Sequence, residues 1–165
     1  MKSLKSTLLV SVFLFSLFGC NSDDDIPFQT KYSSEDLIKL FGGDSKHWGI
    51  QAFYDNYNQK IFNDKSDCYT DDTFVFQKGS NEIMVILGQE SCNLGDPEDE
   101  ITTASYEFYE NDGLIFISIG KAVSVNGAIK NTFFSLQLVE LTDTQMIFAS
   151  GGKGDYKSAI VFIAV

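Results

Sequence analysis

The chain has 165 residues, with 12 basic and 23 acidic side chains and a formal net charge of −11 at pH 7. This acidic balance argues against nucleic acid as a partner, because phosphate backbones need basic contacts. Every basic residue is Lys, so the bidentate Arg clamp that many proteins use for carboxylate and phosphate groups is absent.

The N-terminal segment is typical of an export signal. Lys2 and Lys5 precede a weakly polar to apolar run from Leu8 to Phe18. The run is far shorter than the ~20 residues that a membrane-spanning helix needs, so we interpret it as the core of a signal peptide. An abrupt switch to polar residues follows at Asn21, as expected where a signal ends.

The end of this run, Leu17-Phe18-Gly19-Cys20, resembles the lipobox of bacterial lipoproteins. In that family the Cys is diacylated and the signal is cleaved directly before it. The resemblance implies that residues 1–19 are removed and that Cys20 becomes the lipid-anchored first residue. Loss of Lys2 and Lys5 takes the formal net charge from −11 to −13. The alternative is a plain secretory signal that happens to end in Cys.

Residues 20–32 are expected to form a linker. The segment Asn21-Ser22-Asp23-Asp24-Asp25 has nothing to bury, so it is expected to stay disordered. It resembles the acidic tag that follows the lipidated Cys of surface-exposed lipoproteins in certain Gram-negative bacteria; a solvated spacer is the alternative. We therefore expect a lipid-anchored protein of the outer membrane or cell surface, with the membrane as one partner.

One domain is predicted over residues 33–165. Ser34 to Gly43 predicts a short helix, because serines precede it, acids occupy its first turn and two glycines end it. Runs of β-branched and aromatic residues bounded by turn residues then predict eight strands. Their ranges are 46–55, 73–78, 82–90, 102–110, 114–125, 130–141, 144–151 and 156–164.

The connections between these strands are unequal. Gly79–Asn81, Asn111–Gly113 and Thr142–Asp143 are short and turn-like, whereas the connections over 56–72 and 91–101 are long. Consecutive strands with tight turns favour an all-β, eight-stranded antiparallel up-and-down barrel, since closure removes exposed strand edges. Alternate connections lie at the same end of such a barrel. The short turns and the helix therefore gather at one end and the long loops at the other, which is the layout of a calyx.

Several motifs resemble those of bacterial lipocalin-like lipoproteins. They are Leu40-Phe41-Gly42-Gly43, Ser45-Lys46-His47-Trp48, Cys68 shortly before Asp71-Asp72-Thr73-Phe74-Val75-Phe76, Gly79, Cys92 and Val139-Glu140-Leu141-Thr142. The resemblance runs from about residue 40 to the C-terminus. It implies an eight-stranded lipocalin-like barrel with a binding rather than a catalytic role. Two features depart from the wider lipocalin pattern: Gly43 lies five positions before Trp48 rather than two, and the late-strand Arg that packs on the Trp is missing, with Lys157 the nearest cation.

Cys68 and Cys92 are expected to form a disulfide, because the chain is exported to a compartment where disulfides persist. If Gly79-Ser80-Asn81 is a three-residue hairpin loop, Phe76 pairs with Met84 and Phe74 with Ile86. Extending this ladder places Cys68 opposite Cys92, at a separation that a disulfide can bridge. A bulge would shift the register by one residue without separating the two cysteines far.

Candidate catalytic and metal-binding residues are few. His47 is the only histidine and is predicted at the closed end, so we expect no enzyme and no cofactor. Asp71 and Asp72 are adjacent on an extended chain and face opposite ways, which makes them a poor acid–base pair. Acidic residues of the two long loops form a weak candidate cation site, with a solvated acidic rim as the alternative. These residues are Asp67, Asp71, Asp72, Asp96 and Asp99.

Two functions suit this barrel, whose interior is either just filled or admits one ligand. The first is binding of a small apolar ligand inside the barrel. The candidate interior residues are Trp48, Phe74, Phe76, Tyr106, Phe108, Leu114 and Phe116, with Trp48 either a plug or a ligand platform. The second is a filled barrel whose loops or outer face engage an envelope protein or a glycan. Residues 114–119 and 158–165 are apolar on both faces of their strands, which favours the second function.

Overall fold

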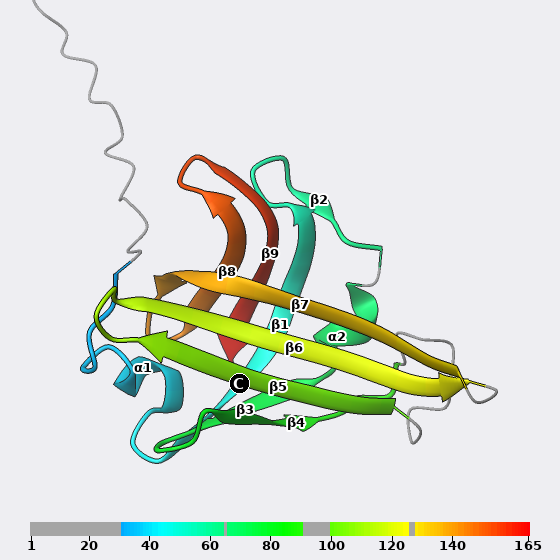
Figure 1. The fold of residues 1–165 in the computed structure, drawn as a ribbon, viewed down its shortest axis with the longest axis horizontal. Coiled ribbons are helices and arrows are strands. Elements are labelled where there is room, and N and C mark those ends of the chain that lie inside the picture. The colour runs from blue at the N-terminus through cyan, green and yellow to red at the C-terminus, as the bar shows by residue number, and fades with distance from the viewer. Residues whose placement is uncertain (1–30, 65, 91–99, 126–127) are drawn as a thin grey trace, which may run out of the picture.

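Nine strands and two short helices make up the part of the chain that the computed structural model describes, residues 31–64, 66–90, 100–125 and 128–165 (Figure 1). Neither helix in these ranges has the length or apolar character needed to cross a membrane. The elements are α1 (Ile38–Phe41), β1 (Ser45–Asn56), β2 (Ile61–Phe62), α2 (Asp67–Thr70), β3 (Thr73–Gln77), β4 (Glu82–Ile86), β5 (Glu100–Tyr109), β6 (Leu114–Val125), β7 (Ala128–Leu141), β8 (Gln145–Gly152) and β9 (Asp155–Ala164).

Strand β1 closes the sheet into a barrel. Its first half pairs with β3 and its second half with β9, while β3 to β9 follow one another as antiparallel neighbours. The register shifts between Ile50 and Ala52, which is a bulge of the kind that bends a strand. Because of this bend, β1 can pair with β3 along one part and with β9 along another, which joins the two edges of the sheet. The predicted eight-stranded antiparallel up-and-down barrel is therefore confirmed, and β2 is a two-residue addition to the edge of β1.

The predicted strands are present, and the helix predicted from Ser34 to Gly43 is shorter, since α1 spans only Ile38–Phe41. Further differences lie inside the long connections. The segment between β1 and β3, predicted as a loop, contains β2 and the one-turn helix α2. Strand β4 ends at Ile86 rather than Glu90, because the Asp71 carboxylate accepts hydrogen bonds from the backbone N–H groups of Gln89 and Glu90 at 2.5 and 2.9 Å. These side-chain bonds take the place of a strand ladder.

The β3–β4 register differs by one residue from the prediction. Phe74 pairs with Val85 and Val75 with Met84, so the loop has four residues, 78–81, with Gly79 at a φ of 78°. The ladder also stops at Thr73, since the chain before it turns into α2. The predicted β3–β4 register is therefore wrong by one residue, and its ladder does not extend to Cys68. The disulfide itself remains a prediction, because Cys92 lies outside the described residues.

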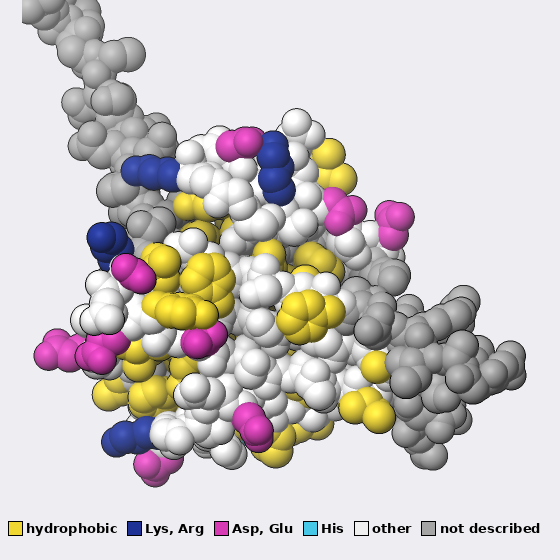
Figure 2. Space-filling view, viewed as in Figure 1, with side chains coloured by type: hydrophobic (Ala, Val, Ile, Leu, Met, Phe, Trp, Pro, Cys, Tyr) yellow, Lys and Arg dark blue, Asp and Glu magenta, His cyan; other side chains and the backbone are white. Residues whose placement is uncertain are grey.

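The core of the barrel is built from alternating residues. Ile115, Ile117 and Ile119 of β6 are completely buried, as strand periodicity requires for an inner face. Leu114 and Phe116 alternate with them and are only half-buried, so they face outward, contrary to the prediction that they line the interior. The Phe116 ring packs edge-on against Tyr109 at 5.7 Å. Figure 2 shows apolar side chains gathered on the viewed face over the last residues of β5 and the first residues of β6.

The closed end of the barrel carries α1 and the short turns (Figure 1). The indole N–H of Trp48 donates to the Leu40 carbonyl at 2.8 Å, which fixes the end of α1 over the barrel. The Tyr32 N–H donates to the Gly113 carbonyl in the β5–β6 turn at 2.7 Å. Gly113 has a φ of 69° and meets the Tyr32 backbone so closely that a Cβ atom would crowd it. The first described residues are therefore held at the closed end.

Candidate functional site

The barrel interior is filled by large side chains. Trp48, Phe74, Phe76 and Tyr106 are buried in one core cluster, as predicted, and Phe108 packs against it while partly buried. The Phe74 and Phe162 rings meet edge-on at 5.3 Å, and Phe76 stacks on Tyr106 at 5.8 Å. Aromatic contacts of this kind stabilise a packed core. The two pockets described below open at the surface and reach the edge of this cluster.

Trp48 plugs the closed end, where a cation covers it. The Lys46 Nζ atom lies 4.3 Å from the centre of the Trp48 ring and donates to the Lys39 and Asp143 carbonyls at 3.1 and 2.5 Å. Burial lowers the pKa of Lys46, against the effect of the nearby Asp143 carboxylate. Lys46 thus lies over the Trp48 ring. Lys157, the cation nearest in sequence to the missing late-strand Arg, is instead exposed and ion-paired with Asp155 at 2.6 Å.

His47 follows Lys46 on β1 and points the other way. Its side chain is exposed on the outer face, and its carbonyl accepts the Val165 N–H at 3.1 Å. His47 therefore lies at the closed end of the barrel, as predicted.

The loop-rich end is covered by α2 and held by a buried ion pair. The Lys121 Nζ atom lies 2.5 Å from the Asp72 Oδ2 atom, and both side chains are about 1% exposed. The same ammonium donates to the Cys68 carbonyl at 3.2 Å and lies 4.8 Å from the centre of the Tyr69 ring. Lys121 projects inward from β6, so its contacts tie α2 across the barrel.

Burial raises the pKa of Asp72, and hydrogen bonds from the Lys121 ammonium and the Gly88 N–H act in the opposite direction. The Gly88 bond is 2.9 Å long and reaches the Asp72 Oδ1 atom. A side chain at Gly88 would clash with the neighbouring Asp71 carboxylate, so glycine is needed for this close approach. The carboxylate therefore joins β3, β6 and the segment after β4.

The burial of Lys121 and its ion pair with Asp72 were not predicted from the sequence. A Lys in a strand is normally placed on the solvent face, because lysines are almost never fully buried without a partner. The only available signal was its position two residues after Ile119, on the inward face of β6.

The predicted cation site is not assembled among the described residues. Asp71 binds the backbone after β4 and Asp72 pairs with Lys121, so both carboxylates have structural partners. Asp67 is exposed at the start of α2, and Asp96 and Asp99 lie outside the described residues. Within these ranges no three His, Cys, Asp or Glu side chains form a group that could hold a metal ion.

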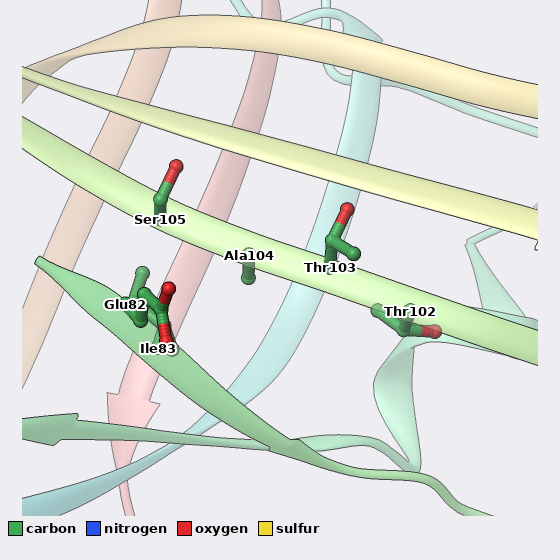
Figure 3. Close-up of a pocket in the computed structure, with 6 residues that line it drawn as sticks. All are labelled: Glu82, Ile83, Thr102, Thr103, Ala104 and Ser105. Carbon is green, nitrogen blue, oxygen red and sulfur yellow. The ribbon is translucent and has the colours of Figure 1, made fainter.

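A first surface pocket lies at a seam between β4 and β5. Their ladder consists of the pairs Glu82–Ser105 and Ile83–Ala104, beyond which β4 diverges from β5 (Figure 3). The pocket, here called the seam pocket, has a volume of about 430 Å³ and is lined by Glu82, Ile83 and residues 102–105. Met84, Ile86 and Ile101 are exposed apolar side chains on the adjoining strands.

A second pocket, here called the mouth pocket, lies at the loop-rich end. Strand β7 pairs with β8 only from Gln137 onward, so its first half has β6 as its one strand neighbour among the described residues. In Figure 1 the β8–β9 hairpin and the end of β1 swing away from β6 and β7 in this region. The pocket has a volume of about 330 Å³, and its lining residues are Phe53, Asp55, Asn63, Asp64, Tyr69, Phe133, Phe134 and Ser158.

The mouth pocket combines an aromatic floor with a polar rim. The Phe53 ring lies 5.6 Å from Tyr69 and 5.3 Å from Phe134, and Tyr69 lies 6.0 Å from Phe134. On the rim, the Asn63 amide donates to the Asp55 carboxylate at 2.6 Å. Such a pocket can receive a small amphiphilic molecule with its apolar part against the rings and its polar part at the rim.

Comparisons of this chain with protein-family models, with curated proteins and with solved structures found no match. The function is therefore inferred from the chemistry of the site.

Proposed function

We propose that this protein is a lipid-anchored binding protein of the bacterial envelope, with a lipocalin-like barrel that takes a small amphiphilic ligand at its loop-rich end. The mouth pocket is the observation that carries the proposal. It offers about 330 Å³ over a floor of packed rings, near the lower limit of small-molecule sites. The core below it is occupied by aromatic side chains, so the ligand binds at the mouth and not deep in the barrel.

The position of the anchor supports this arrangement. Tyr32 is held at the β5–β6 turn, at the opposite end of the barrel from the mouth pocket. A chain running from Tyr32 back to a lipidated Cys20 therefore tethers the closed end. A flexible linker of this length reaches about 20 Å, which leaves the mouth facing away from the membrane and open to ligand.

A neutral fluorescent amphiphile, N-phenyl-1-naphthylamine, tests ligand binding at the mouth. We expect its emission to rise on addition of the protein and the rise to be lost in Ser158→Tyr, which narrows the mouth pocket. Ser105→Tyr, the matched change at the seam pocket, should retain the response. The single Trp48, at the far end, verifies folding of both variants by its emission. Equal binding by both variants would contradict the proposal.

A second candidate function is interaction with another envelope protein. Met84 and Ile86 of β4 are each about half exposed and Ile101 of β5 is 68% exposed, next to a ladder of only two residue pairs. Exposed apolar side chains grouped at an incomplete sheet edge favour a docking surface. A photo-crosslinker placed at Ile86 in the native envelope should then yield one specific adduct, and the same probe at the exposed Gln51 should yield none. Absence of an adduct at Ile86 would exclude this candidate.

A further inference from the structure

The chemistry of the mouth pocket identifies the class of ligand that it fits. Its lining divides into aromatic rings and acidic or neutral polar groups, and no Lys occurs among its described residues. Phe53 and Tyr69 are buried beneath it, while the Phe133 ring is 68% exposed at its edge. The pocket therefore presents ring surfaces without an accompanying positive charge.

Two carboxylates add negative charge to these rings. Asp55 and Asp64 line the same pocket and are both exposed. The Asn63 amide orients one Asp55 oxygen through its 2.6 Å hydrogen bond and carries no charge. The faces of aromatic rings carry a partial negative charge, so the rings and the two carboxylates all attract a cation.

Three lysines of neighbouring elements, among the side chains that the structure describes, do not neutralise this site. Lys157 is ion-paired with Asp155 at 2.6 Å, and Lys60 lies 3.4 Å from the centre of the Tyr57 ring on the outer side of β1. Lys121 lies on the inner side of Tyr69, where Asp72 balances its charge. The described lining of the pocket is therefore acidic, in keeping with the net charge of −11 of the whole chain.

We propose that the mouth pocket binds a small organic cation, such as an alkylammonium or quaternary ammonium group. This inference rests on the proposed function and specifies its ligand. A bare Ca²⁺ ion would need six to eight oxygen ligands, whereas about half of this pocket is aromatic ring. An anion would meet the two carboxylates, and a neutral ligand would leave their charge without a counterpart.

Three water-soluble molecules of nearly the same shape but different charge test whether charge or shape determines binding to the mouth pocket. Choline carries a trimethylammonium group, 3,3-dimethyl-1-butanol carries carbon in place of that nitrogen, and 3,3-dimethylbutanoate is an anion. In ¹⁵N-resolved NMR titrations of the full soluble domain, choline should produce saturable shifts at Phe53, Asp64 and Phe134. We expect the neutral isostere to bind at least about tenfold more weakly and the anion more weakly still.

Two variants test the residues that make the site. Asp64→Asn should weaken choline binding about three- to tenfold and leave the neutral isostere unaffected, because it removes charge with little change of shape. Phe133→Leu should also weaken choline binding, since it removes an exposed ring face. Asp112→Asn, in the β5–β6 turn at the closed end, is the matched control and should bind choline like the wild type.

The outcomes separate the two proposals. If the isostere or the neutral sugar methyl β-glucoside binds in the mouth pocket as tightly as choline, the cation assignment is overturned and ligand binding at the mouth stands. If no probe, N-phenyl-1-naphthylamine included, shifts the pocket residues, both proposals fail. Choline shifts that are centred elsewhere, or that persist unchanged in Asp64→Asn, also overturn the cation assignment.

Discussion

Replacement of Lys121 by Met tests how the loop-rich end is held together. The variant keeps an unbranched side chain in the barrel but removes the ammonium, which leaves the Asp72 carboxylate buried with the Gly88 N–H as its remaining donor. At the 2.5 Å distance between Nζ and Oδ2, an effective dielectric constant of about 20 gives a gross attraction of about 7 kcal/mol. Local relaxation and entry of water reduce the net loss of stability to about 3–5 kcal/mol.

Urea and thermal unfolding measure this loss. A loss of 3–5 kcal/mol corresponds to a fall in Tm of about 6–20 °C for a domain of this size. The double variant K121M/D72N should recover most of it, because no buried charge is left unpaired, and D72N completes the double-mutant cycle. Lys153→Met, at an exposed position in the β8–β9 turn, is the control and should change stability by less than about 0.5 kcal/mol.

The pH dependence of K121M gives an independent readout. Burial already raises the pKa of Asp72 in the wild type, and loss of Lys121 removes a group that lowers it. A carboxyl whose pKa is raised on folding contributes stability that is fully present below its unfolded pKa of about 4 and is lost as the pH rises through the folded pKa. The stability gap between wild type and K121M should therefore narrow as the pH falls from 7 to 4.

Three results would refute this reasoning. The first is a loss of stability in K121M below about 1 kcal/mol at pH 7, which would mean that Asp72 is effectively solvated. The second is a double variant no more stable than K121M. The third is a difference in stability between the wild type and K121M that stays constant between pH 7 and pH 4.

Three further predictions concern other parts of the chain. Cys20→Ala should move the protein from the membrane fraction to the soluble fraction, because the acyl chains that hold it in the bilayer are lost; unchanged fractionation contradicts lipid anchoring. In the exported, unreduced protein Cys68 and Cys92 should resist alkylation in mass spectrometry, and replacing both by Ser should cost roughly 3 kcal/mol, since their bridge closes a loop of about 25 residues; two alkylated thiols would rule out the pair. Lys46→Met should cost about 1–2 kcal/mol in urea unfolding and alter Trp48 emission, because the cation leaves the ring and its carbonyl bonds are lost; unchanged emission would show that the contact does not form.

The barrel could be predicted from the sequence because its signals are local. Gly79, Gly113 and the Thr142–Asp143 pair mark turns wherever a β-branched or aromatic run ends, and strand order in a meander follows chain order. Alternation of connections then placed the helix and the short turns at one end. The bulge in β1 near Gln51, just after the two residues that pair with both β3 and β9, had no comparable local signal.

Which side chains face inward was harder to predict where a strand is apolar on both faces. At the start of β6, residues 114–117 are apolar at every position, so over these residues the hydrophobic period carries no information on which side chains face inward. Phe116 was assigned to the interior, whereas Ile117 is the buried residue. In β3 the pattern was less ambiguous, and Phe74 and Phe76 face the core as predicted.

The candidate site depended on contacts between distant parts of the chain. Lys121 meets Asp72 only after β6 and the start of β3 have come together inside the barrel, and neither residue signals the other locally. The mouth pocket likewise needs the end of β1, the first half of β7 and the start of β9 at one place. The acidic loops of this end could be predicted from the sequence, whereas the aromatic rings packed beneath them could not.

The closed end and the loop-rich end of the barrel differ in what their residues hold in place. At the closed end, Trp48, Lys46 and Tyr32 hold α1 and the start of the domain against the barrel. If the proposed lipid tether joins this end to a membrane, anionic lipids would repel the strongly negative domain. Tether and repulsion together would then keep the closed end toward the bilayer and the mouth pocket away from it. The proposed binding at the mouth pocket would need no movement of the packed core, because the rings of its floor are already fixed by their contacts with one another.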